Sequence, residues 1–206
     1  MIVGALLTAV ALLLLSLLPG APSETVAMAA WVERGRSLLS WSDELLFFAV
    51  ICWGAGARGL FGRRKAEPSM RINVGVTALA VALVSLVVLL LEVGRLIYPV
   101  FEIQLSAEAL ALVVSEAFGA LHLAFLGFAV AAVALSWSTR AGLIGRAVGI
   151  FAAAAFIVGS FPWLTPTWWN SLTAVLVAAW GVFLALATVT RSENPGDATE
   201  RMSTTV

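Results

Sequence analysis

The sequence contains few of the side chains that metal sites and cofactor-dependent enzymes require. It has one cysteine, Cys52, one histidine, His122, and one lysine, Lys65. These single residues exclude an intrachain disulfide, a cysteine-rich metal site, bis-histidine haem ligation and a histidine-rich zinc site. Because Lys65 lies in a basic segment, no lysine is left in an apolar segment to form a Schiff base. We therefore expect no metal and no cofactor.

Charge is also scarce. Charged side chains make up 12% of the sequence and hydrophobic ones 61%, and the mean hydropathy is +1.01. Soluble domains carry about 25% charged residues, so this composition indicates a membrane protein. Residues 147–190 contain no charged side chain at all. The 12 basic and 12 acidic residues balance, so no positive surplus points to a nucleic acid as a partner.

The apolar runs predict an all-α fold, a polytopic membrane bundle of six transmembrane helices. A span needs about 20 apolar residues, and lipid leaves no place for the open edge of a sheet. The predicted spans cover about residues 1–18, 43–61, 72–98, 107–137, 145–161 and 171–190. They form a single domain over residues 1–190, and residues 191–206 follow as a polar cytoplasmic tail.

Three boundaries of the predicted spans allow more than one interpretation. Residues 1–18 lack a basic start and exceed the apolar core of a signal peptide, about 7–15 residues, so a retained span is favoured over a leader. Residues 28–41 mix apolar with charged side chains and are either an interfacial segment or an extension of the second span. Prolines within residues 160–170 break the long uncharged run, and Asn170 or Ser171 can cap the next helix.

Basic residues near the span ends predict that both termini lie on the cytoplasmic side. The inner side then carries Arg58, Arg63, Arg64, Lys65, Arg71, Arg140, Arg146, Arg191 and Arg201. The outer side carries only Arg34, Arg36 and Arg95.

Ionisable side chains within spans are costly and are therefore the candidates for function. They are Glu92 and Arg95 in the third predicted span and Glu116 and His122 in the fourth, with Glu44 at the outer end of the second. Arg95 can pair with Glu92 in its own helix or with Glu116 in the next. A structural role, in which the charges neutralise one another and fix the helix register, is the favoured interpretation.

Small residues predict how the third and fourth spans meet. Ala78, Ala82, Ser85 and Glu92 share one helical face, and Ala111, Ser115, Gly119 and His122 share another. Such stripes are typical of close helix contacts, so we expect the two faces to pack together. His122 would then either hydrogen-bond Ser85, the favoured interpretation, or relay protons. Gly145 and Gly149 form a third small-residue stripe, for which internal packing is favoured over dimerisation.

The stretch from about Ala117 to Thr190 has a pattern of helices and breaks that is similar to that of a known family. A long apolar helix ends in the turn SWSTRAGLIGRAVGI, and a Gly/Ala-rich helix, a Pro/Trp break and a last apolar helix follow. This pattern resembles a family of bacterial six-span integral membrane proteins classified as a domain of unknown function. The resemblance implies a six-helix bundle, multi-pass, in the bacterial inner (plasma) membrane. It implies no reaction and assigns no functional residue.

Three functions are compatible with the sequence. The favoured one is binding or transport of a lipophilic or cationic small molecule in an outer-half polar pocket lined by Glu44, Glu92, Arg95 and Glu116, with His122 beneath. The first alternative is an accessory or scaffold subunit of a larger membrane complex. The short loops favour this alternative, because they offer no soluble catalytic domain. The second alternative is an intramembrane lipid-modifying enzyme that uses Glu116 and His122. The expected partners are the lipid bilayer and either a lipophilic ligand or a membrane protein.

Overall fold

The computed structural model describes residues 1–61, 69–98, 101, 103–139 and 141–189. The predicted basic loop around residues 63–65, Arg140 and the tail 191–206 therefore lie outside the described residues. The described part contains six helices and no strand. The helices are α1 (Ile2–Ser16), α2 (Thr25–Phe61), α3 (Met70–Ile97), α4 (Ala107–Ser136), α5 (Gly142–Gly159) and α6 (Thr167–Val189).

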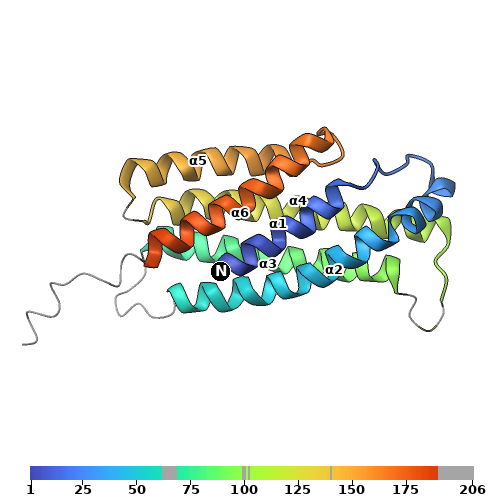
Figure 1. The fold of residues 1–206 in the computed structure, drawn as a ribbon, viewed down its shortest axis with the longest axis horizontal. Helices are drawn as coiled ribbons and strands as arrows, with labels where there is room; N and C mark the ends of the chain where they lie inside the picture. The colour runs from blue at the N-terminus through green and yellow to red at the C-terminus, as the bar shows by residue number, and fades with distance from the viewer. Residues whose placement is uncertain (62–68, 99–100, 102, 140, 190–206) are drawn as a thin grey trace, which may run out of the picture.

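Consecutive helices run antiparallel in one bundle, and the start of α1 and the end of α6 point toward the same end (Figure 1). Five helices, α2 to α6, are long and apolar enough to cross a membrane. This arrangement is that of a multi-pass membrane protein, and the all-α prediction is confirmed. The first helix is shorter, with 15 residues. At 1.5 Å per residue it covers roughly 22 Å, less than the roughly 30 Å of a hydrocarbon core.

The second helix settles the alternative for residues 28–41, because these residues belong to it. It has 37 residues, or roughly 55 Å, and so extends well beyond the thickness of a bilayer core. Met28, Trp31 and Val32 in this extension are buried, and the indole Nε1 of Trp31 donates to the carbonyl of Pro19 at 2.7 Å. The extension is therefore part of the packed bundle end.

The predicted pairing of the third and fourth spans is confirmed, because α3 with α4 is the most extensive contact in the bundle. The face predicted for α4 is wrong. Ser115 and Gly119 are exposed, and a Cβ on Gly119 would meet nothing within 4 Å. The close approach lies instead at Gly127, where a Cβ would lie 2.9 Å from the backbone oxygen of Ala78 and from Ala82. Both faces of α4 carry small residues, so the stripe alone did not select the buried face.

A cluster of aromatic rings fills the centre of the bundle. Trp53, Phe128, Phe156 and Trp180 come from four helices, and each is no more than 1% exposed. Trp53 and Trp180 stack with centroids 6.0 Å apart, and Phe128 packs against both. Both indole groups are satisfied, because Trp53 Nε1 donates to Thr8 Oγ1 at 3.2 Å and Trp180 Nε1 donates to Ser136 Oγ at 3.1 Å. These bonds fix α1 and α4 to the cluster.

Glycines bring α5 against α4. A Cβ on Gly149 would lie 2.7 Å from the backbone oxygen of Ala132, and one on Gly145 would lie 2.8 Å from that of Ser136. The helix is entered through Gly142, whose φ of +59° is a conformation that glycine adopts without strain. The prediction of internal packing for the Gly145–Gly149 stripe is therefore confirmed.

Candidate functional site: a pocket at one end of the bundle

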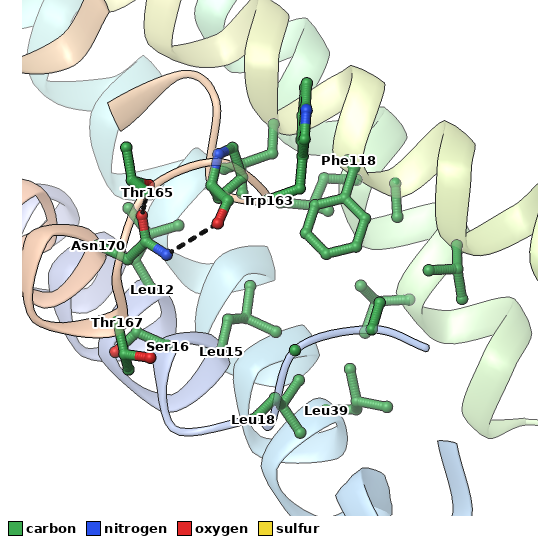
Figure 2. Close-up of a pocket in the computed structure, with 18 of the residues that line it drawn as sticks. Leu12, Leu15, Ser16, Leu18, Leu39, Phe118, Trp163, Thr165, Thr167 and Asn170 are labelled. Carbon is green, nitrogen blue, oxygen red and sulfur yellow. Dashed lines mark hydrogen bonds between the residues drawn. The ribbon is translucent and has the colours of Figure 1, made fainter. Parts of the chain in front are cut away.

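A pocket of about 280 Å³ lies at the end of the bundle where α1 ends and α6 begins (Figure 2). Its walls come from α1, α2, α3, α4 and α6 and from the α1–α2 and α5–α6 connections. All of these segments reach the same end because consecutive helices are antiparallel. The volume is near the lower limit of small-molecule sites, about 300–1,000 Å³.

Most of the lining is apolar. The side chains come from four helices and the α5–α6 connection: Leu12, Leu15, Leu39, Leu89, Val93, Leu96, Val114, Ala117, Phe118, Leu121, Phe125 and Trp163. Figure 2 shows Leu15, Leu18, Leu39 and Phe118 around the open space. Such a surface favours hydrocarbon, because each buried methylene group gains about 0.8 kcal/mol.

Polar side chains gather on one side of the pocket: Ser16, Thr165, Thr167, Asn170 and Thr173. The amide Nδ2 of Asn170 donates to the carbonyl of Pro162 at 3.1 Å, and Thr165 Oγ1 donates to Asn170 Oδ1 at 2.6 Å (Figure 2). A primary amide has two N–H groups and two acceptor lone pairs. Asn170 therefore keeps one donor and one acceptor beyond these two bonds.

The position of Asn170 follows from where α6 begins. This helix starts at Thr167, before the predicted start at residue 171, so Asn170 lies in its first turn and not at its cap. Pro162 and Pro166 interrupt the chain before it, and the Asn170 side chain folds back to hold this connection. The predicted capping role of Asn170 or Ser171 is therefore wrong, and the amide is instead part of the pocket wall.

The connection between α1 and α2 forms the opposite wall. Pro19, Gly20 and Ala21 line the pocket, and Trp31 holds this segment through its bond to Pro19. The extension of α2 is thus what brings Trp31 and Leu39 to the site.

None of the described residues that line the pocket carries a formal charge. An ion placed there loses several kcal/mol of hydration, and the lining offers it no counter-ion. The N-terminus of α6 favours an anion by only about 0.3–1 kcal/mol. Desolvation is the larger effect, so the pocket is suited to an uncharged molecule.

The predicted site residues lie around this end of the bundle but do not line the pocket. Glu92 is half-buried on α3, Glu116 is exposed on α4, and the two lie close enough to repel each other electrostatically. Arg95 forms no ion pair within 4.0 Å among the described residues, so the predicted pairing with Glu92 or Glu116 is not formed. Among the described residues, both carboxylates are thus left without the predicted arginine partner.

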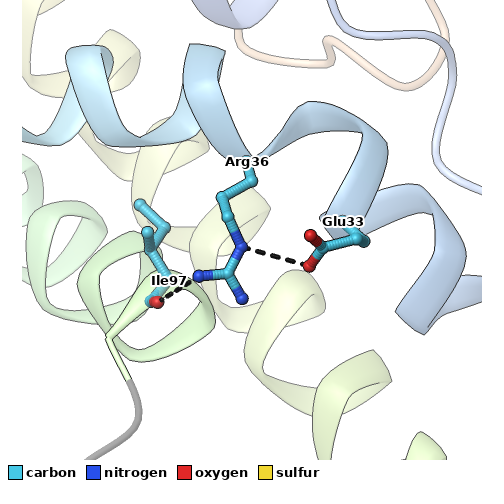
Figure 3. Close-up of polar contacts among 3 residues, drawn as sticks. All are labelled: Glu33, Arg36 and Ile97. Atoms are coloured by element: carbon cyan, nitrogen blue, oxygen red, sulfur yellow. Dashed lines mark hydrogen bonds and ion pairs between the residues drawn. The ribbon is translucent and has the colours of Figure 1, made fainter.

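Glu44 belongs to a separate polar seam between α2 and α3. Its Oε1 accepts a hydrogen bond from the hydroxyl of Tyr98 at 3.3 Å, and that hydroxyl is also 3.2 Å from Ser40 Oγ. Arg36 continues the seam, because its guanidinium donates to the last carbonyl of α3, at Ile97, and to Glu33 (Figure 3). This seam joins the two helices at the bundle end and leaves Glu44 exposed.

His122 lies behind the pocket wall and not beside Ser85. Its Nδ1 is 2.9 Å from the carbonyl oxygen of Ser160, and its ring lies 4.8 Å from that of Phe161 and 6.2 Å from that of Trp163. A carbonyl can only accept, so Nδ1 carries the proton, and in neutral imidazole Nε2 is then the unprotonated nitrogen. The predicted bond to Ser85 is wrong, since Ser85 Oγ donates to Val81 in its own helix.

One buried acid was missed. Asp43 is 9% exposed, its Oδ1 has no hydrogen-bond partner, and a Cβ on Gly94 of α3 would lie 3.7 Å from it. The residue that the sequence predicted for the site is its neighbour Glu44. The available signal was helical spacing, because Asp43 lies at i+4 from Leu39 and i−3 from Leu46, which are both buried.

No protein-family model, no curated protein and no solved structure matches this chain.

Proposed function

We propose that this protein binds or transports a lipophilic small molecule in the pocket between α1, α4 and the α5–α6 connection. The observation that supports the proposal most directly is the pocket itself, with an apolar wall and a polar group of side chains on one side. Pockets of this composition are the usual sites of small-molecule binding. The pocket replaces the acidic site expected from Glu44, Glu92, Arg95 and Glu116.

We further propose six spans, with α1 as the first, and both termini on the cytoplasmic side of a bacterial inner membrane. The pocket then opens toward the outer face. Arg58, Arg71 and Arg146 lie at the opposite end, where the positive-inside rule expects basic residues. Arg71 and Arg146 both lie next to the ring of Trp137 at this end, and the guanidinium carbon of each is 5.9 Å from the ring centroid.

A reaction at Glu116 and His122 has less support. The two residues are six positions apart, so on an ideal helix their side chains point about 120° away from each other. Glu116 is exposed, and His122 Nδ1 is engaged by Ser160. We therefore assign neither residue a catalytic role.

The proposal is tested by filling the pocket. Ala117 lines the pocket from α4 and is 8% exposed. The substitution Ala117→Leu therefore places three more heavy atoms in the pocket and reduces its free volume. Ala154 on α5 is exposed on the lipid-facing surface, which makes Ala154→Leu the matched control. We expect native mass spectrometry of protein released from mild detergent to show a bound lipid or ligand in the wild type and in Ala154→Leu. Ala117→Leu should lose it.

Two results would count against the proposal. The first is a wild-type protein that carries no lipid or ligand under these conditions. The second is equal occupancy in Ala117→Leu and the wild type, which would place the bound molecule elsewhere. A stoichiometric partner subunit found in the same spectra, with no bound lipid, would favour the scaffold alternative.

A further inference from the structure

We infer that the pocket takes a lipid with a single hydrocarbon chain and an uncharged head group that both donates and accepts hydrogen bonds, as a hydroxyl does. This inference rests on the proposed function and names the chemical class of the ligand.

The head group is specified by unused hydrogen-bonding capacity. Asn170 keeps one N–H and one lone pair after its bonds to Pro162 and Thr165. The hydroxyl of Thr165 has one proton for two neighbouring acceptors, the carbonyl of Phe161 at 3.1 Å and Asn170 Oδ1 at 2.6 Å. The hydroxyl of Thr167 makes no hydrogen bond to any described residue, and Thr167 also lines the pocket. A donor and an acceptor are thus both open on the same side of the pocket, and a ligand hydroxyl matches both.

The absence of charge in the described lining restricts the head group further. A carboxylate, phosphate or ammonium group at the half-buried Asn170 would give up part of its water without meeting an opposite charge. The first turn of α6 favours a partial negative charge, such as the oxygen of a hydroxyl or ester, but it does not replace a counter-ion. A hydroxyl head group therefore fits the site, and an ionised one does not.

The volume restricts the chain. A cavity of about 280 Å³ is small for a ligand site and has room for part of one hydrocarbon chain, so a second chain would stay outside it. The apolar wall at Leu89, Val93, Leu121 and Phe125 comes from α3 and α4, whereas the polar side chains come from α1, from α6 and from the connection before α6, so this wall receives the chain. Each added methylene should tighten binding by up to about four-fold until the cavity is full.

The experiment compares four twelve-carbon probes on the purified full chain in nanodiscs. They are monododecanoylglycerol, dodecanoate, dodecylammonium and didodecanoylphosphatidylglycerol, and binding is measured by native mass spectrometry and by competition with radiolabelled monododecanoylglycerol. We expect monododecanoylglycerol to bind at least ten-fold more tightly than either ion and than the two-chain lipid. Ala117→Leu should weaken its binding by at least ten-fold, which assigns binding to the pocket.

Two head-group variants test the polar side. Thr167→Val keeps the shape of an exposed side chain that has no described partner, so the fold should survive, and we expect monododecanoylglycerol to bind about 3–10-fold more weakly. Asn170→Leu should weaken it more, but it also removes the bond to Pro162. Thr77→Val, at an exposed position of α3 away from the pocket, is the control and should leave binding unchanged.

The outcomes distinguish failure of this inference from failure of the proposed function. Tighter binding of dodecanoate, dodecylammonium or the two-chain lipid, sensitive to Ala117→Leu, would overturn this inference and leave the proposed function standing. Unchanged affinity of monododecanoylglycerol in both Thr167→Val and Asn170→Leu would also overturn it. If none of the four probes binds, or if Ala117→Leu weakens the binding of none of them, the proposed function is contradicted as well.

Discussion

The carbonyl oxygen of Ser160 accepts a hydrogen bond from Nδ1 of His122 at 2.9 Å. This bond joins the middle of α4 to the start of the α5–α6 connection, which supplies Pro162, Trp163 and Thr165 to the pocket. The ring of His122 also contacts those of Phe161 and Trp163. The single histidine is therefore a positioning residue for one wall of the pocket.

His122→Ala should loosen that wall. It leaves the carbonyl of Ser160 without its donor and removes a ring from the contact with Phe161. A buried unpaired carbonyl costs about 1–3 kcal/mol, so we expect a lower thermal midpoint in detergent and faster hydrogen exchange in residues 160–166. His122→Asn, whose amide can still donate at the same position, should lose less. Equal exchange in the wild type and His122→Ala would contradict this role.

Gly127→Ala should destabilise the contact between α3 and α4. The new Cβ would lie 2.9 Å from backbone atoms of Ala78 and Ala82, which cannot move aside independently. Such overpacking costs about 1–3 kcal/mol, measured as a lower midpoint of unfolding in SDS titration. Gly119→Ala on the same helix meets nothing within 4 Å and should be neutral or stabilising by about 0.4–1 kcal/mol. If Gly119→Ala destabilised the protein more than Gly127→Ala, the face of α4 that the sequence predicted would be the one that packs against α3.

Thr8→Val should weaken the attachment of α1 to the aromatic core. The substitution keeps the shape of the side chain but leaves Trp53 Nε1 without its acceptor at a position that is fully buried. We expect a loss of about 1–3 kcal/mol in unfolding free energy, while Thr8→Ser retains the hydroxyl and most of the stability. Thermal melts followed by tryptophan fluorescence check this. Equal melting of Thr8→Val and Thr8→Ser would show that the hydrogen bond contributes nothing.

Asp43→Asn should stabilise the protein at pH 8. Asp43 is buried with an unpartnered Oδ1, and the amide has the same shape without the charge. Removing an uncompensated buried charge should gain at least about 1 kcal/mol. Glu44→Gln is the control, since its exposed side chain keeps an acceptor for Tyr98 and should change stability by less than about 0.5 kcal/mol. A lower midpoint for Asp43→Asn would mean that the carboxylate has a partner at that site.

The proposed topology is checked by labelling single cysteines. In a Cys52→Ser background, Ala66→Cys lies between α2 and α3, and Leu164→Cys lies in the α5–α6 connection. We expect an impermeant thiol reagent added to intact cells to label Leu164→Cys alone, and Ala66→Cys to react only after the membrane is opened. Labelling of both from the same side would rule out the six-span arrangement.

The sequence by itself determined the helical membrane class and most helix positions. Long uncharged runs such as residues 147–190 are too apolar to be exposed to water, so they are expected in a membrane. Prolines and glycines mark where such runs must turn. The ends of α3 and α4 fall within a few residues of the predicted ones for this reason. The packing stripe at Gly145 and Gly149 was readable too, because two glycines four residues apart lie on the same face of a helix.

The tertiary structure decided which faces are buried and where the pocket lies. Helix α4 has small residues all round, so only its neighbours distinguish Gly127 from Gly119. Likewise, adjacent acids on α2 differ in burial because Gly94 of α3 receives Asp43 and leaves Glu44 outside. The pocket combines Leu12, Leu39, Phe118 and Asn170 from four different helices. Spacing within one helix cannot report such a site, because long-range packing alone sets the distances between helices.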